Sequence, residues 1–129
     1  MHMLNRDALI LIVDDMRFMR NAIKRGLNSL GYSNLIEAAD GAEAVTLVKD
    51  HDVGFIFMDI VMPIMTGLEA FHKIREFNSE VPIAILTSIA DQKTIDDCRG
   101  YGVFDYILKP LNASSCPDLL KKALEKFLP

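Results

Sequence analysis

Five short apolar runs alternate along the chain with five longer amphipathic stretches, and this alternation constrains the fold more than any other feature. Each amphipathic stretch carries apolar residues at three-to-four spacing, which is typical of a helix that buries one face. Strands that alternate with helices form a parallel sheet with helices on both faces. The runs that we predict as strands are residues 8–13, 35–39, 54–58, 83–86 and 104–108.

Only a few arrangements of such a sheet remain once every crossover is right-handed. We predict an α/β fold of the flavodoxin-like (βα)5 class, with a five-stranded parallel sheet of order 2-1-3-4-5. The length of 129 residues fits one domain, and we assign residues 1–129 to it. Residues 1–6 are expected to be a disordered or cloning-derived N-terminus.

Polar side chains mark where the predicted helices begin. Asp40 and Thr66 are each followed three residues later by a glutamate, which predicts an N-cap, and Asp91 is expected to cap the fourth helix. Proline is tolerated only in the first turn of a helix, so Pro117 predicts a late start for the last helix. We place Ser115 as the N-cap of this last helix, and we expect the apolar face of the helix to include Phe127.

Composition excludes several classes of function. The formal net charge is −4 and no basic patch stands out, so direct nucleic-acid binding is not expected. The longest apolar runs are too short to cross a bilayer, and no leader peptide is recognisable, so we expect no membrane insertion. Cys98 and Cys116 have neither metal-type nor redox-type spacing, which indicates a reducing, cytoplasmic location.

Polar residues follow four of the five predicted strands. Asp14 and Asp15 end the first strand, Asp59 ends the third, Thr87 the fourth and Lys109 the fifth. In open α/β sheets, ligands bind beyond the carboxyl ends of the strands where the strand order reverses. In the order 2-1-3-4-5 that point lies between the first and third strands, so the three aspartates are expected to converge.

Three converging carboxylates need a compensating cation or a proton. Two unit charges about 4 Å apart repel by about 4 kcal/mol at an effective dielectric constant near 20. An all-oxygen site suits Mg²⁺, and a carboxylate can also attack phosphorus to give an aspartyl phosphate. Phosphoryl transfer needs positioning and charge neutralisation, which the Lys109 ammonium and the Thr87 hydroxyl would supply.

These residues lie in segments that together resemble the receiver domain of bacterial response regulators over about residues 8–128. The resemblance includes the overall size of the chemotaxis regulators. The matching segments are Val13-Asp14-Asp15, Met58-Asp59-Ile60-Val61-Met62-Pro63, Gly67, Leu86-Thr87-Ser88 and Tyr106-Ile107-Leu108-Lys109-Pro110.

The resemblance implies a phosphoacceptor domain of two-component signal transduction, not an enzyme acting on a separate substrate. Asp59 would accept the phosphoryl group from a phosphohistidine on a sensor histidine kinase or a phosphotransfer protein. Mg²⁺ would be held directly by Asp15, Asp59 and the backbone carbonyl of Val61, and through water by Asp14. The Lys109–Pro110 peptide bond is expected to be cis.

A switch is also implied by the resemblance. After phosphorylation the Thr87 hydroxyl would move toward the new oxygens, and Tyr106 would turn inward. The face made by the fourth helix, fifth strand and fifth helix would then bind a downstream target protein or a fused output domain, and phosphorylation-dependent dimerisation is open. The late start of the last helix puts the usual form of this face in question.

Other readings of the same residues remain open. A scaffold that ignores phosphorylation would keep the fold but leave Asp59 unreactive. A haloacid-dehalogenase-type phosphatase also uses an aspartate nucleophile, but it needs an acid two residues later, where this chain has Val61. A flavin carrier needs a phosphate-binding loop after the first strand, where the acidic pair would repel phosphate.

The remaining polar residues receive no role. His2, His51 and His72 lie away from the strand ends on which the site is built. Arg17 and Arg20 follow the acidic pair along the chain, and we expect both side chains to be solvated, where either could contact a kinase.

Overall fold

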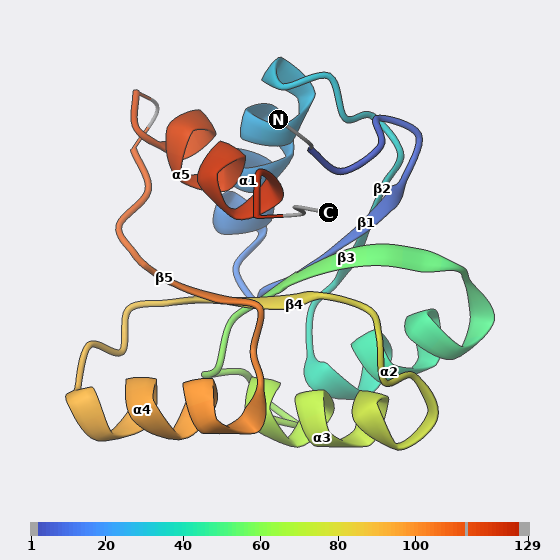
Figure 1. Cartoon of the computed structure of the whole chain (residues 1–129), viewed down its shortest axis with the longest axis vertical. Coiled ribbons are helices and arrows are strands. Elements are labelled where there is room, and N and C mark those ends of the chain that lie inside the picture. The colour runs from blue at the N-terminus through green and yellow to red at the C-terminus, as the bar shows by residue number, and fades with distance from the viewer. Residues whose placement is uncertain (1–2, 113, 127–129) are drawn as a thin grey trace.

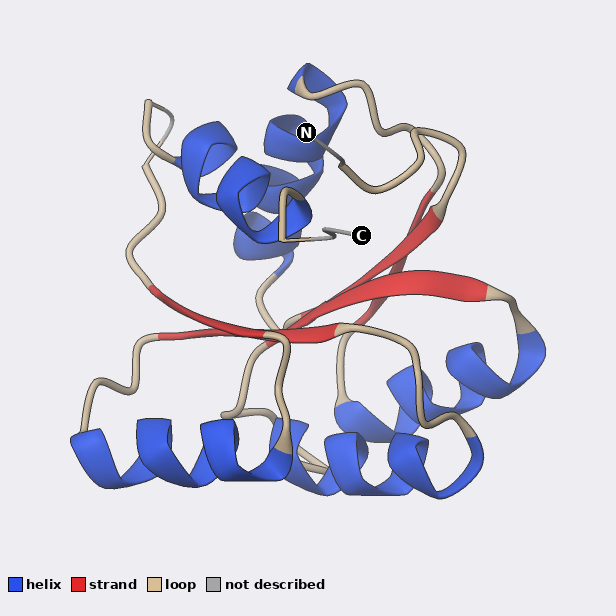
Figure 2. Cartoon of the chain, in the orientation of Figure 1, coloured by secondary structure: helices blue, strands red, loops and turns tan. Residues whose placement is uncertain are grey.

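A computed structural model describes residues 3–112 and 114–126, and it contains a five-stranded parallel sheet between two layers of helices (Figures 1 and 2). The strand order is β2-β1-β3-β4-β5, and every neighbouring pair is parallel, which confirms the predicted topology. The strands are β1 (Leu9–Val13), β2 (Leu35–Ala38), β3 (Val53–Met58), β4 (Ile83–Thr87) and β5 (Asp105–Leu108).

The helices divide between the two faces of the sheet. Figure 1 shows α1 and α5 on one face and α2, α3 and α4 on the other, which is the flavodoxin-like arrangement. Among the described residues, no helix is long and apolar enough to cross a membrane. The helices are α1 (Arg17–Ser29), α2 (Gly41–Asp50), α3 (Gly67–Phe77), α4 (Gln92–Tyr101) and α5 (Cys116–Leu124).

The continuous apolar runs follow from burial on both faces of the sheet. In β1, Ile10 and Ile12 belong to the core beneath α1 and α5, whereas Leu11 and Val13 belong to the core beneath α2 and α3. Successive side chains of a strand point to opposite faces, so a central strand covered on both sides has no position for a polar residue. The first polar positions come where the strand ends.

Side-chain caps fix where α2, α3 and α4 begin. The side chains of Asp40, Thr66 and Asp91 accept hydrogen bonds from the backbone amides three residues later, as the sequence predicts. Thr66 and Glu69 form a reciprocal capping box, since the Glu69 carboxylate also accepts from the Thr66 amide at 3.1 Å. The predicted starts of these helices are therefore confirmed.

The start of α5 is predicted correctly but stabilised differently. Ser115 occupies the N-cap, yet its side chain makes no capping hydrogen bond. Asn112 organises the turn instead, because its Oδ1 accepts from the amides of Ser114 and Ser115 at 3.0 and 2.9 Å. Asn112 also accepts at its carbonyl from the amide of Cys116. Phe127, expected on this helix, lies outside the described residues.

Residues 3–6 pack against the domain, whereas the sequence predicts that residues 1–6 form a disordered or cloning-derived N-terminus. Met3 and Leu4 are partly buried against the core under α1 and α5. The Tyr32 hydroxyl donates to the carbonyl of Leu4 at 2.5 Å, and Arg6 donates to the carbonyl of Leu30 at 2.9 Å. Residues 1–2 lie outside the described residues.

Candidate functional site

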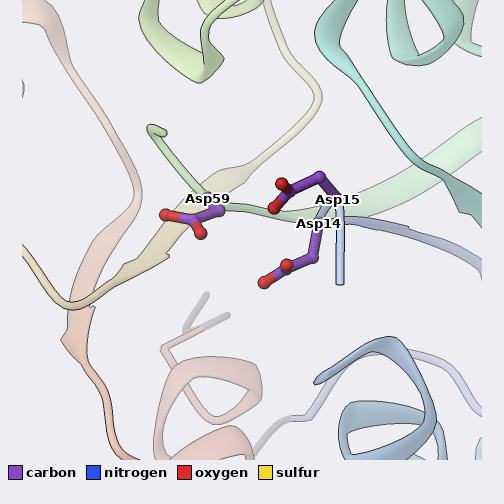
Figure 3. Close-up of side chains that lie close together, drawn as sticks. All are labelled: Asp14, Asp15 and Asp59. Carbon is purple, nitrogen blue, oxygen red and sulfur yellow. The ribbon is translucent and has the colours of Figure 1, made fainter. Parts of the chain in front are cut away.

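Three carboxylates meet at the carboxyl ends of β1 and β3, as the order of the strands predicts. Figure 3 shows Asp14 and Asp15 beside Asp59, and their nearest carboxylate oxygens lie within 4.8 Å of one another. Asp14 is only 1% exposed and Asp59 only 8%, whereas Asp15 is exposed. This acidic site therefore has two buried carboxylates and one that is exposed to solvent.

The backbone fixes the two buried carboxylates. The amide of Asp14 donates to the carbonyl of Ala38 on β2, and the amide of Asp59 donates to the carbonyl of Val13 on β1. The first residue beyond each strand is thus still held by the neighbouring strand. One oxygen of each carboxylate is also fixed, because Asp14 Oδ1 accepts from the Met16 amide at 2.9 Å and Asp59 Oδ1 accepts from the Ile60 amide at 2.7 Å.

Lys109 supplies a cation between these carboxylates. Its ammonium donates to Asp14 Oδ2 at 2.7 Å and to Asp59 Oδ2 at 3.0 Å, and its side chain is 11% exposed. Burial alone would lower the pKa of Lys109, but the hydrogen bonds and charges of the two aspartates outweigh it and raise that pKa. The Lys109–Pro110 bond is cis, as the resemblance implies.

Thr87 and Tyr106 meet at one residue of the loop after β4. The Thr87 side chain is fully buried at the end of β4, and its hydroxyl oxygen accepts from the amide of Ile89 at 3.4 Å. The Tyr106 hydroxyl donates to the carbonyl of the same Ile89 at 2.7 Å. Burial of the Tyr106 ring, aided by nearby negative groups, raises the pKa of its hydroxyl to about 12.

Gly67 allows α3 to begin directly against the backbone of Asp59. A Cβ atom at Gly67 would lie 1.9 Å from the carbonyl oxygen of Asp59, which no side chain could tolerate. The amide of Gly67 donates to the carbonyl of Ile60 at 2.8 Å, so the loop between β3 and α3 closes on itself. The position of Asp59 therefore depends on the absence of a side chain at Gly67.

The loop between Asp59 and α3 presents apolar side chains to solvent. Ile64 is 83% exposed and has a φ of 71°, an unusual conformation for a β-branched residue. It is the centre of a γ-turn in which the Met65 amide donates to the carbonyl of Pro63 at 2.7 Å. The side chain of Val61 is also exposed, and its amide lies 3.4 Å from Asp59 Oδ1. The implied metal-binding role of the Val61 carbonyl stays a prediction.

Arg20 belongs to the site, and the expectation that its side chain is solvated is wrong. Its Nη1 donates to the backbone carbonyl of Asp14 at 2.6 Å, its Nε donates to Glu37 Oε1 at 3.0 Å, and only 13% of the side chain is exposed. A sequence signal did exist, because a cation near a helix N-terminus is disfavoured by the helix dipole and calls for an anionic partner. Arg17 is exposed, as expected.

The carboxylate oxygens of the acidic site suit a hard divalent cation. Carboxylate oxygens are the ligands that Mg²⁺ prefers, and Mg²⁺ is commonly held by one or two carboxylates with remaining positions left to water or phosphate. Asp15 is the exposed member of the trio, so the acidic site can be reached from solvent. The residues present are thus compatible with Mg²⁺, and a phosphoryl group could approach from the same side.

Comparisons with known sequences show which proteins this chain is similar to. Residues 10–122 match the family described as the response regulator receiver domain. The chain is similar to chemotaxis protein CheY-3 of Vibrio cholerae serotype O1, with 36% identity over 126 residues that span 96% of this chain and 97% of the relative. Chemotaxis protein CheY of Bacillus subtilis is 36% identical over 115 residues, spanning 89% of this chain and 96% of the relative.

Solved structures give the same result for the fold. The chain is similar to the chemotaxis protein CheY4 of Vibrio cholerae, with a TM-score of 0.83, 30% identity, and coverage of 95% of this chain and 99% of that one. It is also similar to a chain of the CheX–CheY–BeF3–Mg²⁺ complex of Borrelia burgdorferi, with a TM-score of 0.85, 29% identity, and coverage of 95% and 90%.

Proposed function

The chain belongs to the response regulator receiver family, and from that premise we propose that Asp59 accepts a phosphoryl group in two-component signalling. The donor is a phosphohistidine on a sensor histidine kinase or a phosphotransfer protein. The observation that carries this proposal is the position of the Asp59 carboxylate, which shares the Lys109 ammonium with Asp14 and lies in one cluster with the acidic pair that follows β1. We further propose that the whole chain forms one receiver domain and acts on no separate substrate.

In the proposed transfer, an oxygen of Asp59 attacks phosphorus, the phosphorus–nitrogen bond of the donor breaks, and the imidazole takes up a proton. Lys109 lies 3.0 Å from Asp59 Oδ2, so its ammonium is close enough to pair with the incoming phosphoryl oxygens. The Thr87 hydroxyl donates to another of these oxygens. Both groups act by positioning and neutralising charge, the main requirement of phosphoryl transfer.

Asp15, Asp59 and the backbone carbonyl of Val61 would hold Mg²⁺ directly, and Asp14 would hold it through water. When bound, Mg²⁺ supplies positive charge that offsets the negative charge of the phosphoryl oxygens. The cluster of carboxylate oxygens supports this assignment. The Borrelia burgdorferi complex, which contains BeF3 and Mg²⁺ together with CheX and CheY, supports the same type of site here.

We propose that Ile89 connects the phosphorylation site with Tyr106. Its amide bonds to the Thr87 hydroxyl and its carbonyl to the Tyr106 hydroxyl, so a movement of Thr87 toward a phosphoryl group alters both contacts. Phosphorylation adds roughly −1.5 to −2 charges, which makes such a movement favourable. The population of Tyr106 positions then shifts, and with it the face of α4, β5 and α5 that binds a target protein, a fused output domain or a second copy.

The donor protein has to contact the surface around the acidic site in order to bring its phosphorus to Asp59. Four exposed apolar side chains lie on the segments that follow the acidic residues, namely Met16 and Phe18 where α1 begins and Val61 and Ile64 in the loop after β3. Exposed apolar groups of this kind favour a protein partner. We propose that the donor docks on them, and that the exchange takes place in the cytoplasm, which the two free cysteines support.

Intact-mass spectrometry tests the function directly. The protein is mixed with Mg²⁺ and acetyl phosphate, beside Asp59→Asn and beside Asp52→Asn, a matched change at an exposed aspartate in the turn before β3. We expect a Mg²⁺-dependent gain of one phosphoryl group in the wild type and in Asp52→Asn, and none in Asp59→Asn. NMR shifts are expected to spread from Thr87 to Tyr106. No adduct and no shift in any sample would favour a phosphorylation-independent scaffold instead.

A further inference from the structure

The carbonyl of Asp14 lies just beyond the hydrogen-bonded ladder that joins β1 to β2. The last paired residues of this ladder are Val13 and Ala38, and the Asp14 amide still reaches the carbonyl of Ala38 at 3.1 Å. Continuing the parallel ladder would require β2 to offer a further amide to the Asp14 carbonyl, but β2 ends at Ala38. Arg20 takes that place, with its Nη1 2.6 Å from the Asp14 carbonyl oxygen.

The Arg20 side chain is itself held on a second side. Its Nε donates to Glu37 Oε1 at 3.0 Å, and Lys24 Nζ donates to Glu37 Oε2 at 2.9 Å. Glu37 is a member of β2 and is paired with Ile12 in the ladder, so the anchor of Arg20 is part of the sheet. The planar guanidinium therefore joins β2 to the end of β1 through two hydrogen bonds with fixed relative directions.

Holding the Asp14 carbonyl determines more than one atom. The carbonyl of Asp14 and the amide of Asp15 belong to the same planar peptide group, so fixing one fixes the orientation of the other. The directions of the Asp14 and Asp15 side chains both depend on that plane. Groups that orient metal ligands without touching the metal commonly change metal affinity about 10- to 100-fold when they are removed.

We propose that Arg20 is a positioning residue for the cation site, because it fixes the peptide between Asp14 and Asp15 and so directs both carboxylates toward Asp59. The inference deepens the proposed function, since it concerns the Mg²⁺ site on which phosphorylation depends. It assigns Glu37 the role of holding the guanidinium. Lys24 is assigned no part in the cation site, because it contacts Glu37 but not Asp14.

The charge of Arg20 predicts the opposite effect on Mg²⁺ affinity from its geometry. If Arg20 acted only through its charge, its removal would take away a positive charge that repels Mg²⁺, and Mg²⁺ would bind more tightly. If Arg20 acts by orienting the acidic pair, removing it weakens binding. Lys24→Met is the matched control, since it removes one positive charge from the same ion-pair cluster and leaves the contact with Asp14 intact.

Isothermal titration with Mg²⁺, without any phosphoryl donor, separates the two explanations. We expect Arg20→Met to weaken Mg²⁺ binding about tenfold, and Arg20→Lys to weaken it nearly as much because a lysine cannot bridge Glu37 and Asp14 with a fork. Lys24→Met is expected to leave the affinity unchanged or slightly tighter. Arg20→Met behaving like Lys24→Met, or Arg20→Lys retaining the affinity of the wild type, would overturn the inference.

Two further readouts separate this inference from folding and from the proposed function. Amide hydrogen exchange at Asp15 in Mg²⁺-free protein is expected to speed up in Arg20→Lys and not in Lys24→Met, while exchange in β3 and α5 stays the same in both. General acceleration across the sheet would indicate a merely structural role. Absence of Mg²⁺ binding by the wild type would overturn the inference, whereas intact Mg²⁺ binding without phosphorylation would overturn only the proposed function.

Discussion

The two helices α1 and α4 lie on opposite faces of the sheet and are held to it very differently. The face of α1 buries four residues, Met19, Ile23, Gly26 and Leu27, whereas α4 buries only Cys98. At Gly26, a Cβ atom would lie 2.8 Å from Leu120 of α5, but at Gly100 in α4 it would meet nothing within 4 Å. Helix α1 is therefore closely packed against the rest of the domain, whereas α4 has Cys98 as its one buried residue.

The two helices also differ in their contacts with the site. The acidic pair leads directly into α1, and Arg20 of α1 donates to the backbone carbonyl of Asp14. Tyr106, by contrast, packs on the cluster that contains Cys98. Segments with few buried contacts open most readily, so α4 is the element best suited to respond. The acidic pair is therefore next to the well-packed helix α1, and the proposed response involves the weakly packed helix α4.

The largest difference in the free energy of unfolding is expected between two lysine substitutions, one in the acidic site and one on α4. Lys109→Met leaves two buried carboxylates without their cation, and we expect a loss of about 3 kcal/mol in the free energy of unfolding in Mg²⁺-free buffer. Lys93→Met removes the exposed partner of Asp97 on α4, and we expect no measurable change. Urea unfolding monitored by circular dichroism measures both values.

Mg²⁺ provides the internal check on that contrast. If repulsion between the aspartates causes the loss in Lys109→Met, adding Mg²⁺ should restore much of the stability. Equal destabilisation with and without Mg²⁺ would point to lost packing of the lysine side chain instead. A clear destabilisation by Lys93→Met would contradict the view that α4 is lightly held.

Alanine substitutions at Gly26 of α1 and Gly100 of α4 should have effects of intermediate size and opposite sign. Gly100→Ala gains helix propensity without a clash, so we expect stabilisation of about 0.5–1 kcal/mol. Gly26→Ala gains the same propensity but forces Leu120 and Cys116 to move, and we expect a net loss of about 1–2 kcal/mol. Thermal or urea unfolding decides the sign of each, and two stabilising changes would remove the distinction between α1 and α4.

Ionisation of Tyr106 should give the smallest effect, on the α4 side alone. Its pKa rises from about 10 to about 12 on folding, because burial disfavours the phenolate. The stability that this group contributes is fully present below pH 10 and is lost as the pH rises toward 12. We expect an extra loss of about 1 kcal/mol, less than the full linkage value since the ring keeps some contact with solvent.

Tyr106→Phe is the control for this titration, because it keeps the ring and removes the ionising group. The free energy of unfolding of the wild type should fall more steeply between pH 10 and pH 11.5 than that of Tyr106→Phe. The phenolate absorbance near pH 12 should be lower in the variant by the contribution of the missing Tyr106 hydroxyl. Identical pH profiles for the two proteins would contradict the burial of this hydroxyl.

The fold and the convergence of the site could be predicted from the sequence because both depend on local patterns. Apolar runs of strand length locate the strands, and Thr66 with Glu69 locates a helix start within one residue. Once the strands are parallel, their carboxyl ends share one edge, so Asp14, Asp59 and Lys109 have to approach each other. None of this requires knowledge of how far one strand extends past its neighbour.

What the sequence did not predict depends on such non-local details. Arg20 is recruited because β2 ends one residue too early to satisfy the carbonyl of Asp14, and an offset of that kind is not visible in a pattern of residue types. The same holds for Asn112, which takes over the capping role expected of Ser115. Leu4 is held by contacts that are distant in the sequence, since it packs against the core under α1 and α5 and its carbonyl accepts from Tyr32, 28 positions later.

The ion pair between Lys109 and Asp14 joins residues 95 positions apart, and this spacing has a consequence for the newly made chain. A ribosome produces the three aspartates long before it produces their cation, so a nascent chain with four strands carries the acidic cluster without its compensating lysine. The last strand completes both the edge of the sheet and the charge balance. We therefore expect the ability to accept a phosphoryl group to appear only after synthesis has passed β5 and Lys109, which denies it to chains that stop after four strands.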